Sequence, residues 1–195
     1  MFIKICGLNS IEAIESSISN GADAIGFVFA ESPRKVSPEK ALSLCKNLPK
    51  KLIKVAVTKN PSKKLFKEII NIFKPDWIQG EANDLLSSKI LNKSSILPVF
   101  RDSQPIIHTY PSRILYEGEN SGKSEIANWG KAAKISERTQ LILAGGLNLT
   151  NIEKAIKIVS PWGVDISSGV ESKLGIKDPK KISAFISLVR SMEKS

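Results

Sequence analysis

The chain has 195 residues, 42% of them hydrophobic, and no Ser-, Gly- or Pro-rich boundary, so we expect one domain, residues 1–195, around a single core. Its formal net charge is +10, but the excess is almost all lysine without interleaved aromatic residues, which favours a solvated surface over a nucleic-acid interface. Two cysteines and one histidine cannot supply a zinc site or a disulfide framework. The sequence also contains no apolar run of the about 18 residues that a membrane-spanning helix needs.

Short β-branched segments alternate with helical segments along the whole chain. The expected strands are residues 2–6, 24–29, 53–57, 77–79, 96–100, 113–116, 140–143 and 163–166. The clearest helices are expected at residues 11–20, 39–48, 62–73, 150–159 and 180–192, each behind a capping residue or a proline.

This alternation predicts a parallel sheet with right-handed crossovers, and eight such units close into a (β/α)₈ TIM barrel. A doubly wound open sheet is the alternative. The fifth helix is hardly visible in residues 102–112, and 195 residues is short for this fold, so we expect a small barrel with a reduced or missing fifth helix.

Two glycine-containing turns follow the last two predicted strands. Turns of this kind let backbone N–H groups crowd around one small anion. The residues expected to bind a phosphate are Gly145, Gly146, Ser167, Ser168 and Gly169. In a barrel, ligands bind at the carboxyl ends of the strands, so the functional residues are sought there.

Three other strand ends carry reactive side chains. Cys6 ends the first strand and is either a buried small hydrophobe or a base whose pKa the site would have to lower. Arg34 follows the second strand, where we favour a ligand contact over a surface salt bridge because arginine is scarce in this chain. Glu117 ends the sixth strand and is a candidate general acid if partial burial raises its pKa.

Other polar residues at the strands and their ends are weaker candidates for the site. Asp165 and Glu171 are more often structural than catalytic in such places, and Glu171 is expected as a solvent-facing residue beyond the phosphate turn. Lys4, Gln79, Arg101 and Asp165 are kept as further candidates for the site. A base and an acid facing one another across a sugar phosphate suit a proton shuttle between adjacent carbons, as in an aldose–ketose isomerisation without a cofactor or a metal.

The sequence resembles the phosphoribosylanthranilate isomerase family from its first strand to its last helix. The segments that carry the resemblance are Lys4-Ile5-Cys6-Gly7, residues 21–29, Ser32-Pro33-Arg34, residues 144–148 and residues 164–171. The resemblance implies a small (β/α)₈ barrel that converts N-(5′-phosphoribosyl)anthranilate into 1-(2-carboxyphenylamino)-1-deoxyribulose 5-phosphate in tryptophan biosynthesis. It also implies that Cys6 removes the ribose C2′ proton, that a carboxylate ending strand six protonates the ring oxygen, and that Arg34 holds the anthranilate carboxylate.

Three departures from the family pattern concern the middle of the chain. The acid ending strand six is usually an aspartate, whereas Glu117 stands here, which moves the carboxyl by roughly a bond length against a tolerance of about 0.5 Å. The family's Gln-Leu-His-Gly-Asp-Glu after strand four is replaced by residues 79–84, without the histidine. After strand three the usual Val-Phe-Val-Asn is replaced by residues 57–60, and Lys35 stands in place of the arginine's aromatic neighbour.

Two other functions stay open at this point. One is an isomerase of a different phosphoribosyl compound, although the chain has no convincing internal repeat. The other is a phosphate-ligand-binding barrel without turnover. We expect a cytoplasmic protein, a monomer or homodimer, whose partner is a small phosphorylated sugar–anthranilate substrate and neither nucleic acid nor a membrane.

Overall fold

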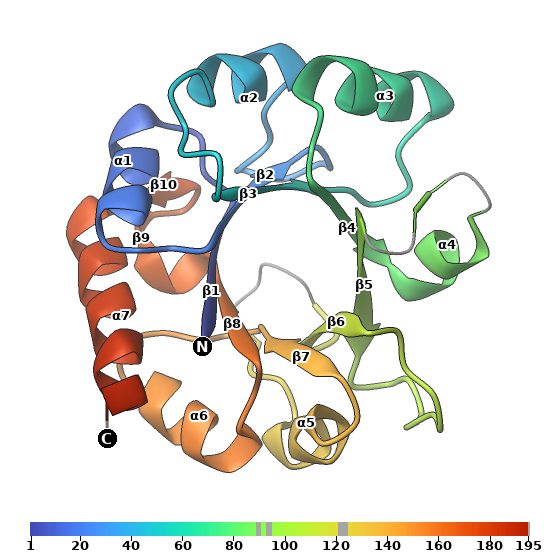
Figure 1. Ribbon diagram of the computed structural model, residues 1–195, viewed down its shortest axis with the longest axis vertical. Helices are drawn as coiled ribbons and strands as arrows, with labels where there is room; N and C mark the ends of the chain where they lie inside the picture. Colours follow the sequence, from blue (N-terminus) through green and yellow to red (C-terminus); the bar gives the residue numbers. More distant parts are fainter. Residues whose placement is uncertain (89–90, 93–94, 121–124, 195) are drawn as a thin grey trace.

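Eight parallel strands close into a barrel, and their order around the ring is their order along the chain (Figure 1). The computed structural model describes residues 1–88, 91–92, 95–120 and 125–194. The strands are β1 (Phe2–Cys6), β2 (Ala24–Val28), β3 (Ile53–Val57), β4 (Trp77–Glu81), β5 (Ile96–Arg101), β6 (Arg113–Glu117), β7 (Gln140–Leu143) and β8 (Gly163–Ile166). β1 pairs with both β2 and β8, which closes the ring and confirms the predicted barrel.

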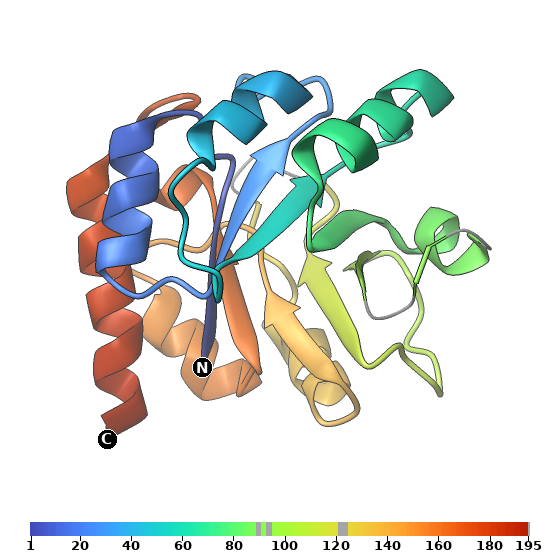
Figure 2. The ribbon, with the colours of Figure 1, turned by 45° about the horizontal axis from the view of Figure 1, so that its top comes forward.

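Helices surround the barrel on the outside (Figures 1 and 2). They are α1 (Ile11–Ser19), α2 (Pro38–Leu44), α3 (Lys63–Glu68) with a π-helical turn (Ile69–Phe73), α4 (Ala82–Ser87), α5 (Trp129–Ser136), α6 (Ile152–Val159) and α7 (Pro179–Ser191). Residues 102–112 between β5 and β6 contain no helix, so the prediction of a missing fifth helix is confirmed. After β8 the chain forms a 3₁₀ turn (Ser168–Val170) and a small hairpin, β9 (Glu171–Lys173) and β10 (Ile176–Lys177), which the sequence did not predict.

Side chains that accept hydrogen bonds from backbone N–H groups cap the starts of several helices. Ser10 and Ser37 accept hydrogen bonds from the backbone three residues ahead, and Asp178 accepts from the two N–H groups that follow Pro179. Two helices begin later than predicted. Residue 62 was expected as the first residue of a helix, but Ser62 caps α3, which begins at Lys63. The helix expected from residue 150 begins at Ile152, after a turn in which Asn148 accepts from the Thr150 N–H.

Two helix ends also differ from the prediction. The predicted helix over residues 62–73 changes from α to π geometry at Ile69, because the N–H of Lys74, in the left-handed conformation, bonds to the Ile69 carbonyl five residues back. The helix predicted over 39–48 ends at Leu44, where Cys45 leaves helical geometry. Neither difference moves a strand end, so neither affects the position of the site.

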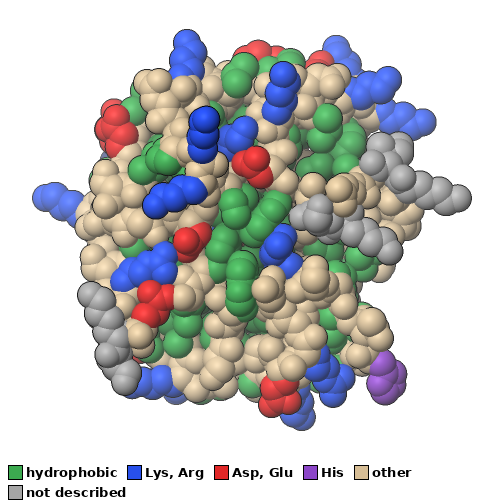
Figure 3. All heavy atoms as spheres, in the orientation of Figure 1, with side chains coloured by type: hydrophobic (Ala, Val, Ile, Leu, Met, Phe, Trp, Pro, Cys, Tyr) green, Lys and Arg blue, Asp and Glu red, His purple; other side chains and the backbone are tan. Residues whose placement is uncertain are grey.

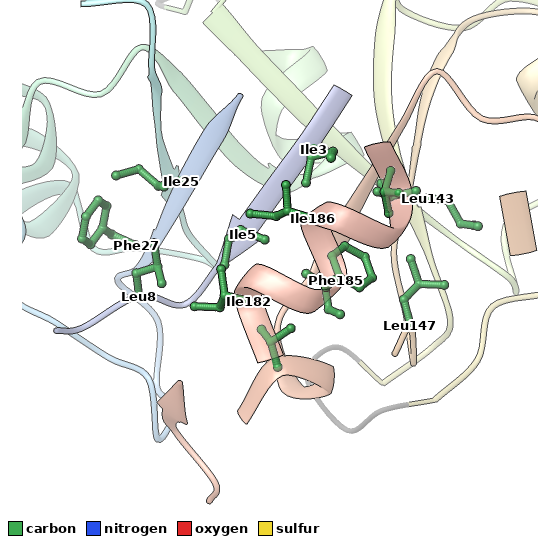
Figure 4. Packing of buried hydrophobic residues seen from close by; sticks show 14 of the residues in the cluster. Ile3, Ile5, Leu8, Ile25, Phe27, Leu143, Leu147, Ile182, Phe185 and Ile186 are labelled. Atoms are coloured by element: carbon green, nitrogen blue, oxygen red, sulfur yellow. The ribbon is translucent and has the colours of Figure 1, made fainter. Parts of the chain in front are cut away.

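Apolar side chains form two layers because successive strand residues point to opposite sides. Inside the barrel lie residues such as Val55, Leu97, Leu115 and Ile142. The larger cluster lies between the strands and the helices, where Ile182, Phe185 and Ile186 of α7 pack near Ile3 and Ile5 of β1 (Figure 4).

Aromatic rings occupy the amino-terminal end of the barrel. Phe2 stacks on Trp162 with ring centroids 4.7 Å apart and on Trp77 at 5.4 Å. The guanidinium of Arg113 lies 3.8 Å from the Trp77 ring centre. These four residues come from the starts of strands β1, β4 and β6 and from the residue before β8, so they fill this end. The strand arrows in Figure 2 point to the opposite end of the barrel. Strands β4, β5 and β6 end there in the charged residues Glu81, Arg101 and Glu117.

Candidate active site

Two adjoining cavities lie at the carboxyl ends of the strands. The larger, about 220 Å³, is lined by side chains from β1 to β6 and the loops after them, including Cys6, Arg34 and Arg101. The smaller, about 40 Å³, lies over the turns after β7 and β8. Glu117, Asp165 and Ser167 line both cavities, so a ligand that occupies both would cross these three residues.

The residues predicted to bind phosphate gather around the smaller cavity. Gly145 and Gly146, both with positive φ, line it together with Ser167 and Ser168. Within the described ranges, the backbone N–H groups of Gly145 and Gly146 donate no hydrogen bond. Gly169 does not line the cavity, because it packs behind it. A Cβ there would lie 2.1 Å from the Leu147 carbonyl oxygen, so Gly169 lets the two turns approach each other.

Cys6 belongs to a buried cluster of ionisable groups from β1 and β8. The Lys4 ammonium, fully buried, donates to Asp165 at 2.7 Å. Burial raises the pKa of the Cys6 thiol, and Lys4 is the largest influence in the opposite direction. A base at Cys6 would require a lowered pKa, and these groups together raise it instead. Asp165 is directed into the barrel as the partner of Lys4.

The space for this cluster comes from Gly26 on the neighbouring strand. A Cβ at Gly26 would lie 3.1 Å from the Cys6 sulfur and 3.3 Å from Lys4 Cε. Both side chains therefore pack over the bare backbone of β2. A larger residue at this position would displace the thiol and the ammonium together.

Arg34 is held by a second buried cluster. Its Nε and Nη2 donate to the two oxygens of Glu171, at 2.6 and 2.9 Å. Lys177 Nζ donates to the same carboxylate at 2.6 Å and to Ser167 Oγ at 3.1 Å. Burial alone would raise the pKa of Glu171, but the hydrogen bonds from Arg34 and Lys177 lower it to about 2.

These contacts correct one expectation and exclude one alternative. Glu171 is buried rather than solvent-facing, because the unpredicted hairpin folds its carboxylate back under Arg34 and also brings in the Gly175 N–H, which donates to it at 3.1 Å. The alternative of a surface salt bridge for Arg34 is likewise wrong, since the pair is buried. Arg34 lines the larger cavity with its orientation fixed.

Glu117 lines the larger cavity together with Cys6 and carries an ion pair. Arg101 Nη1 donates to Glu117 Oε1 at 2.8 Å. The same guanidinium donates to Glu81 through Nη2 at 2.6 Å and Nε at 3.3 Å. The Glu117 side chain is 12% exposed, as partial burial required, but it faces a cation that the sequence did not predict as its partner.

Gln79 is the remaining candidate for the site. Gln79 is buried, lines the cavity, and its Oε1 has no hydrogen-bond partner in the described part of the chain. The histidine and cysteine side chains that zinc or disulfide chemistry would need are few and lie apart. His108 is exposed on the loop between β5 and β6. Cys6 and Cys45 are both free thiols. Among the described residues, no group of three or more His, Cys, Asp and Glu side chains is arranged to hold a metal ion, and no helix is long and apolar enough to span a membrane.

The sequence did not single out two charged residues of this site. Glu81 ends β4 as Glu117 ends β6, and its position at a strand end was the signal that could have identified it. Lys177 lies on the hairpin after β8, and no pattern in the sequence predicted that this segment would return to the site. The Lys and Arg side chains are spread over the face seen in Figure 3 and are not gathered in one patch.

The chain is similar in sequence to the members of one enzyme family. The family described as N-(5′-phosphoribosyl)anthranilate (PRA) isomerase matches residues 3–188. An N-(5′-phosphoribosyl)anthranilate isomerase of Listeria monocytogenes serotype 4b (strain CLIP80459) is 36% identical, covering 99% of this chain and 100% of that protein. The enzyme of that name from Syntrophus aciditrophicus (strain SB) is 38% identical over 96% of this chain and 86% of its own length.

Solved structures show the same similarity. The phosphoribosyl anthranilate isomerase of Thermotoga maritima superposes with a TM-score of 0.84 at 29% identity, covering 98% of this chain and 99% of that one. Another phosphoribosyl anthranilate isomerase structure, solved in complex with reduced 1-(o-carboxyphenylamino)-1-deoxyribulose 5-phosphate, has a TM-score of 0.81 at the same identity and coverage.

Proposed function

The chain belongs to the N-(5′-phosphoribosyl)anthranilate isomerase family, and from this membership we infer that it converts N-(5′-phosphoribosyl)anthranilate into 1-(2-carboxyphenylamino)-1-deoxyribulose 5-phosphate. It is an isomerase of tryptophan biosynthesis. The observation that carries the assignment to this site is that Cys6 and Glu117 line one cavity, which adjoins the glycine turns after β7 and β8.

We propose that Glu117 is the general acid and Cys6 the general base. The Glu117 proton passes to the furanose ring oxygen, the bond from that oxygen to C1′ breaks, and the anilino nitrogen forms a Schiff base with C1′. The Cys6 thiolate then removes the C2′ proton, and the resulting enamine tautomerises to the ketose. Acid and base act on adjacent parts of one sugar, so both must reach it while its phosphate is held.

Lys4 supports the thiolate form of Cys6 in this scheme. Removal of a proton from a buried thiol leaves a negative charge in a medium of low polarity, which is costly without a cation nearby. Burial works to lower the pKa of Lys4, but Asp165 and Cys6 together outweigh it and hold that pKa above its ordinary value. Lys4 therefore stays charged and stabilises the sulfur when it ionises.

Binding residues surround these two groups. We propose that the amides of Gly145 and Gly146 and the turn of Ser167 and Ser168 bind the phosphate, with Gly169 as the residue that lets the turns meet. Arg34, oriented by Glu171, is proposed to contact the anthranilate carboxylate. The unpaired Oε1 of Gln79 is proposed to accept a hydrogen bond from a substrate N–H or hydroxyl group, because a buried acceptor without a partner costs free energy until one arrives.

The assembly and location of the protein follow the same proposal. We propose that residues 1–195 act as one barrel domain, as a monomer or homodimer. The phosphoribosylanthranilate isomerase of Thermotoga maritima is described as dimeric, with engineered monomers. A cytoplasmic location stays a prediction.

The test is turnover of the purified chain. N-(5′-phosphoribosyl)anthranilate should disappear at a rate proportional to protein concentration, with formation of the ribulose product and without added cofactor. The chain should also restore growth of a tryptophan auxotroph that lacks the isomerase. A purified, folded protein that binds the substrate but does not convert it, and fails to rescue growth, would point instead to a binding barrel.

A further inference from the structure

A carboxylate–guanidinium–carboxylate bridge spans three neighbouring strand ends at the mouth of the barrel. Glu81 ends β4, Arg101 ends β5 and Glu117 ends β6. Two nitrogens of the guanidinium, Nη2 and Nε, donate to Glu81 at 2.6 and 3.3 Å, and Nη1 donates to Glu117 at 2.8 Å. The side chains of Glu81, Arg101 and Glu117 are 28%, 14% and 12% exposed, so the bridge is partly shielded from water.

The geometry gives the two carboxylates different roles. A guanidinium is planar, so a partner that engages two of its nitrogens fixes the direction of the third. Glu81 engages two, and Nη1 is thereby directed at Glu117 and at the Gly118 carbonyl, 3.3 Å away. Glu81 anchors Arg101, and Arg101 in turn fixes the Glu117 carboxyl beside the cavity that Cys6 also lines.

The two carboxylates stand at two of the positions where this sequence departs from its family pattern. Glu117 takes the place of a shorter acid, and Glu81 takes the place of the histidine two residues after Gln79. Arg101 connects them. A longer acid has one more rotatable bond and more freedom, so it needs a contact that restricts it if its carboxyl is to stay within about 0.5 Å of a productive position.

The charges explain why a single contact would not suffice. An arginine with no other counter-ion favours the ionised form of an adjacent carboxyl group, whereas a general acid must carry a proton. Burial works to lower the pKa of Arg101, and the hydrogen bond with Glu81 is the largest influence that raises it. Other charged groups also line the two cavities. They are Asp165 of β8, paired with Lys4 of β1, Glu125 of the loop before α5, and Glu31, Arg34 and Lys59 of the loops after β2 and β3.

We propose that Glu81 is the counter-ion and anchor of Arg101, and that the two together are positioning residues that hold Glu117 in place while leaving it free to carry a proton. The inference rests on the proposed isomerase function. With Glu81 ionised and Arg101 charged, the bridge is neutral when Glu117 is protonated, so proton delivery to the substrate does not require an ion pair to break first.

The first test compares Glu81→Gln with wild type. The substitution keeps the shape and one acceptor oxygen but removes the charge. We expect kcat to fall about 10- to 100-fold, because the acid is less often protonated and less well placed. KM and the affinity for the reduced product analogue should stay within about twofold, since Glu81 acts on the chemical step and not on binding. Asp84→Asn, which removes the same charge from an exposed position on α4, should leave kcat unchanged.

The second test asks whether Glu81 acts through Arg101. In an Arg101→Met background, Glu81→Gln should reduce kcat no further, because the group through which it acts is gone. Arg101→Lys should not restore wild-type turnover, since an ammonium cannot engage both carboxylates as a planar fork does. Thermal unfolding of each variant establishes that the barrel is intact.

The outcomes separate this inference from the proposed function. An inactive wild-type chain overturns both. An active wild type whose kcat is unaffected by Glu81→Gln overturns the positioning role and leaves the isomerase assignment in place. The same conclusion follows if Glu81→Gln lowers kcat as much in the Arg101→Met background as it does when Arg101 is present. A matching rise in KM alone would make Glu81 a substrate-binding residue instead.

Discussion

The two halves of the barrel mouth are built differently. On the side of β7, β8, β1 and β2, the mouth consists of backbone turns and of charges buried in pairs, Lys4 with Asp165 and Arg34 with Glu171. On the side of β4, β5 and β6, it consists of the partly exposed bridge through Arg101. The segments that resemble the family pattern lie in the first half, where Lys35 is the one departure named, whereas residues 79–84 and Glu117 in the second half both depart from it.

The difference shows which parts of such a site can change. A turn whose glycines lie against neighbouring backbone has no room for other residues, and a buried charge that loses its partner is left in a medium that solvates it poorly. A partly exposed bridge is less constrained, because water can replace a lost partner. Substitutions in the second half should therefore cost activity, and substitutions in the first half should cost stability as well.

The largest expected effect comes from Cys6, the proposed base, which lies in the buried half. Cys6→Ala should lower kcat by about 10²- to 10⁴-fold with the fold retained, because the group proposed to accept the C2′ proton is lost. Single-turnover and steady-state assays measure the loss. Cys45→Ala, at the end of α2, is the matched control and should keep wild-type kcat. Near-normal turnover by the Cys6 variant would remove it from the mechanism.

The next effect compares the stabilities of the two halves directly. Glu171→Ala leaves Arg34 and Lys177 buried without their shared partner and should destabilise the protein by about 3–5 kcal/mol. Glu81→Ala removes a carboxylate from the partly exposed bridge and should cost only about 0–1 kcal/mol. Urea unfolding of both variants measures the difference. Equal losses would mean that the two halves are equally constrained.

A third effect concerns pH. The pKa of Glu171 is lowered from 4.5 to about 2 in the folded protein, so the ionised carboxylate stabilises the fold above about pH 4.5, and this contribution disappears as the pH falls toward 2. About 3 kcal/mol of stability should be lost across that window. Urea unfolding at several pH values measures it.

Two variants test the origin of that loss. Glu171→Gln should be less stable at neutral pH and should show a smaller change between pH 4.5 and 2. Glu153→Gln, at an exposed position in the first turn of α6, should retain the full change. A wild-type profile that stays flat across the window would contradict a strongly held carboxylate at Glu171.

The fold could be predicted because its signals are local. Alternating strands and helices with Ser, Asp and Pro at the helix starts define the units, and parallel units of this length have few ways to close. The errors lay at helix ends, as at Leu44 and Ile152, where tertiary contacts rather than local propensity decide the boundary.

The site was predictable only where backbone geometry determines it. The glycines of the phosphate turns and the strand end at Cys6 are visible in one short segment each. The partners of Arg34 and Glu117 are not, because Glu171 lies 137 residues from Arg34 and Arg101 lies 16 residues from Glu117 in sequence. An ion pair between distant residues leaves no periodicity or motif, so the sequence located the charged groups but not the pairs they form.

The smallest effect tests whether the backbone-built half is as tightly packed as its glycines suggest. Gly169→Ala places a Cβ 2.1 Å from the Leu147 carbonyl oxygen, so the two phosphate turns must separate, at a cost of about 1–3 kcal/mol and with a higher KM. Gly130→Ala in α5 is the control, because its Cβ meets only Asn128 at 3.5 Å and a helical alanine should stabilise by about 0.5–1 kcal/mol. Thermal unfolding and KM measure both. If Gly169→Ala keeps wild-type stability and KM, the two turns can move apart without cost. The two halves of the barrel mouth would then differ in the kinds of residue that form them but not in their rigidity.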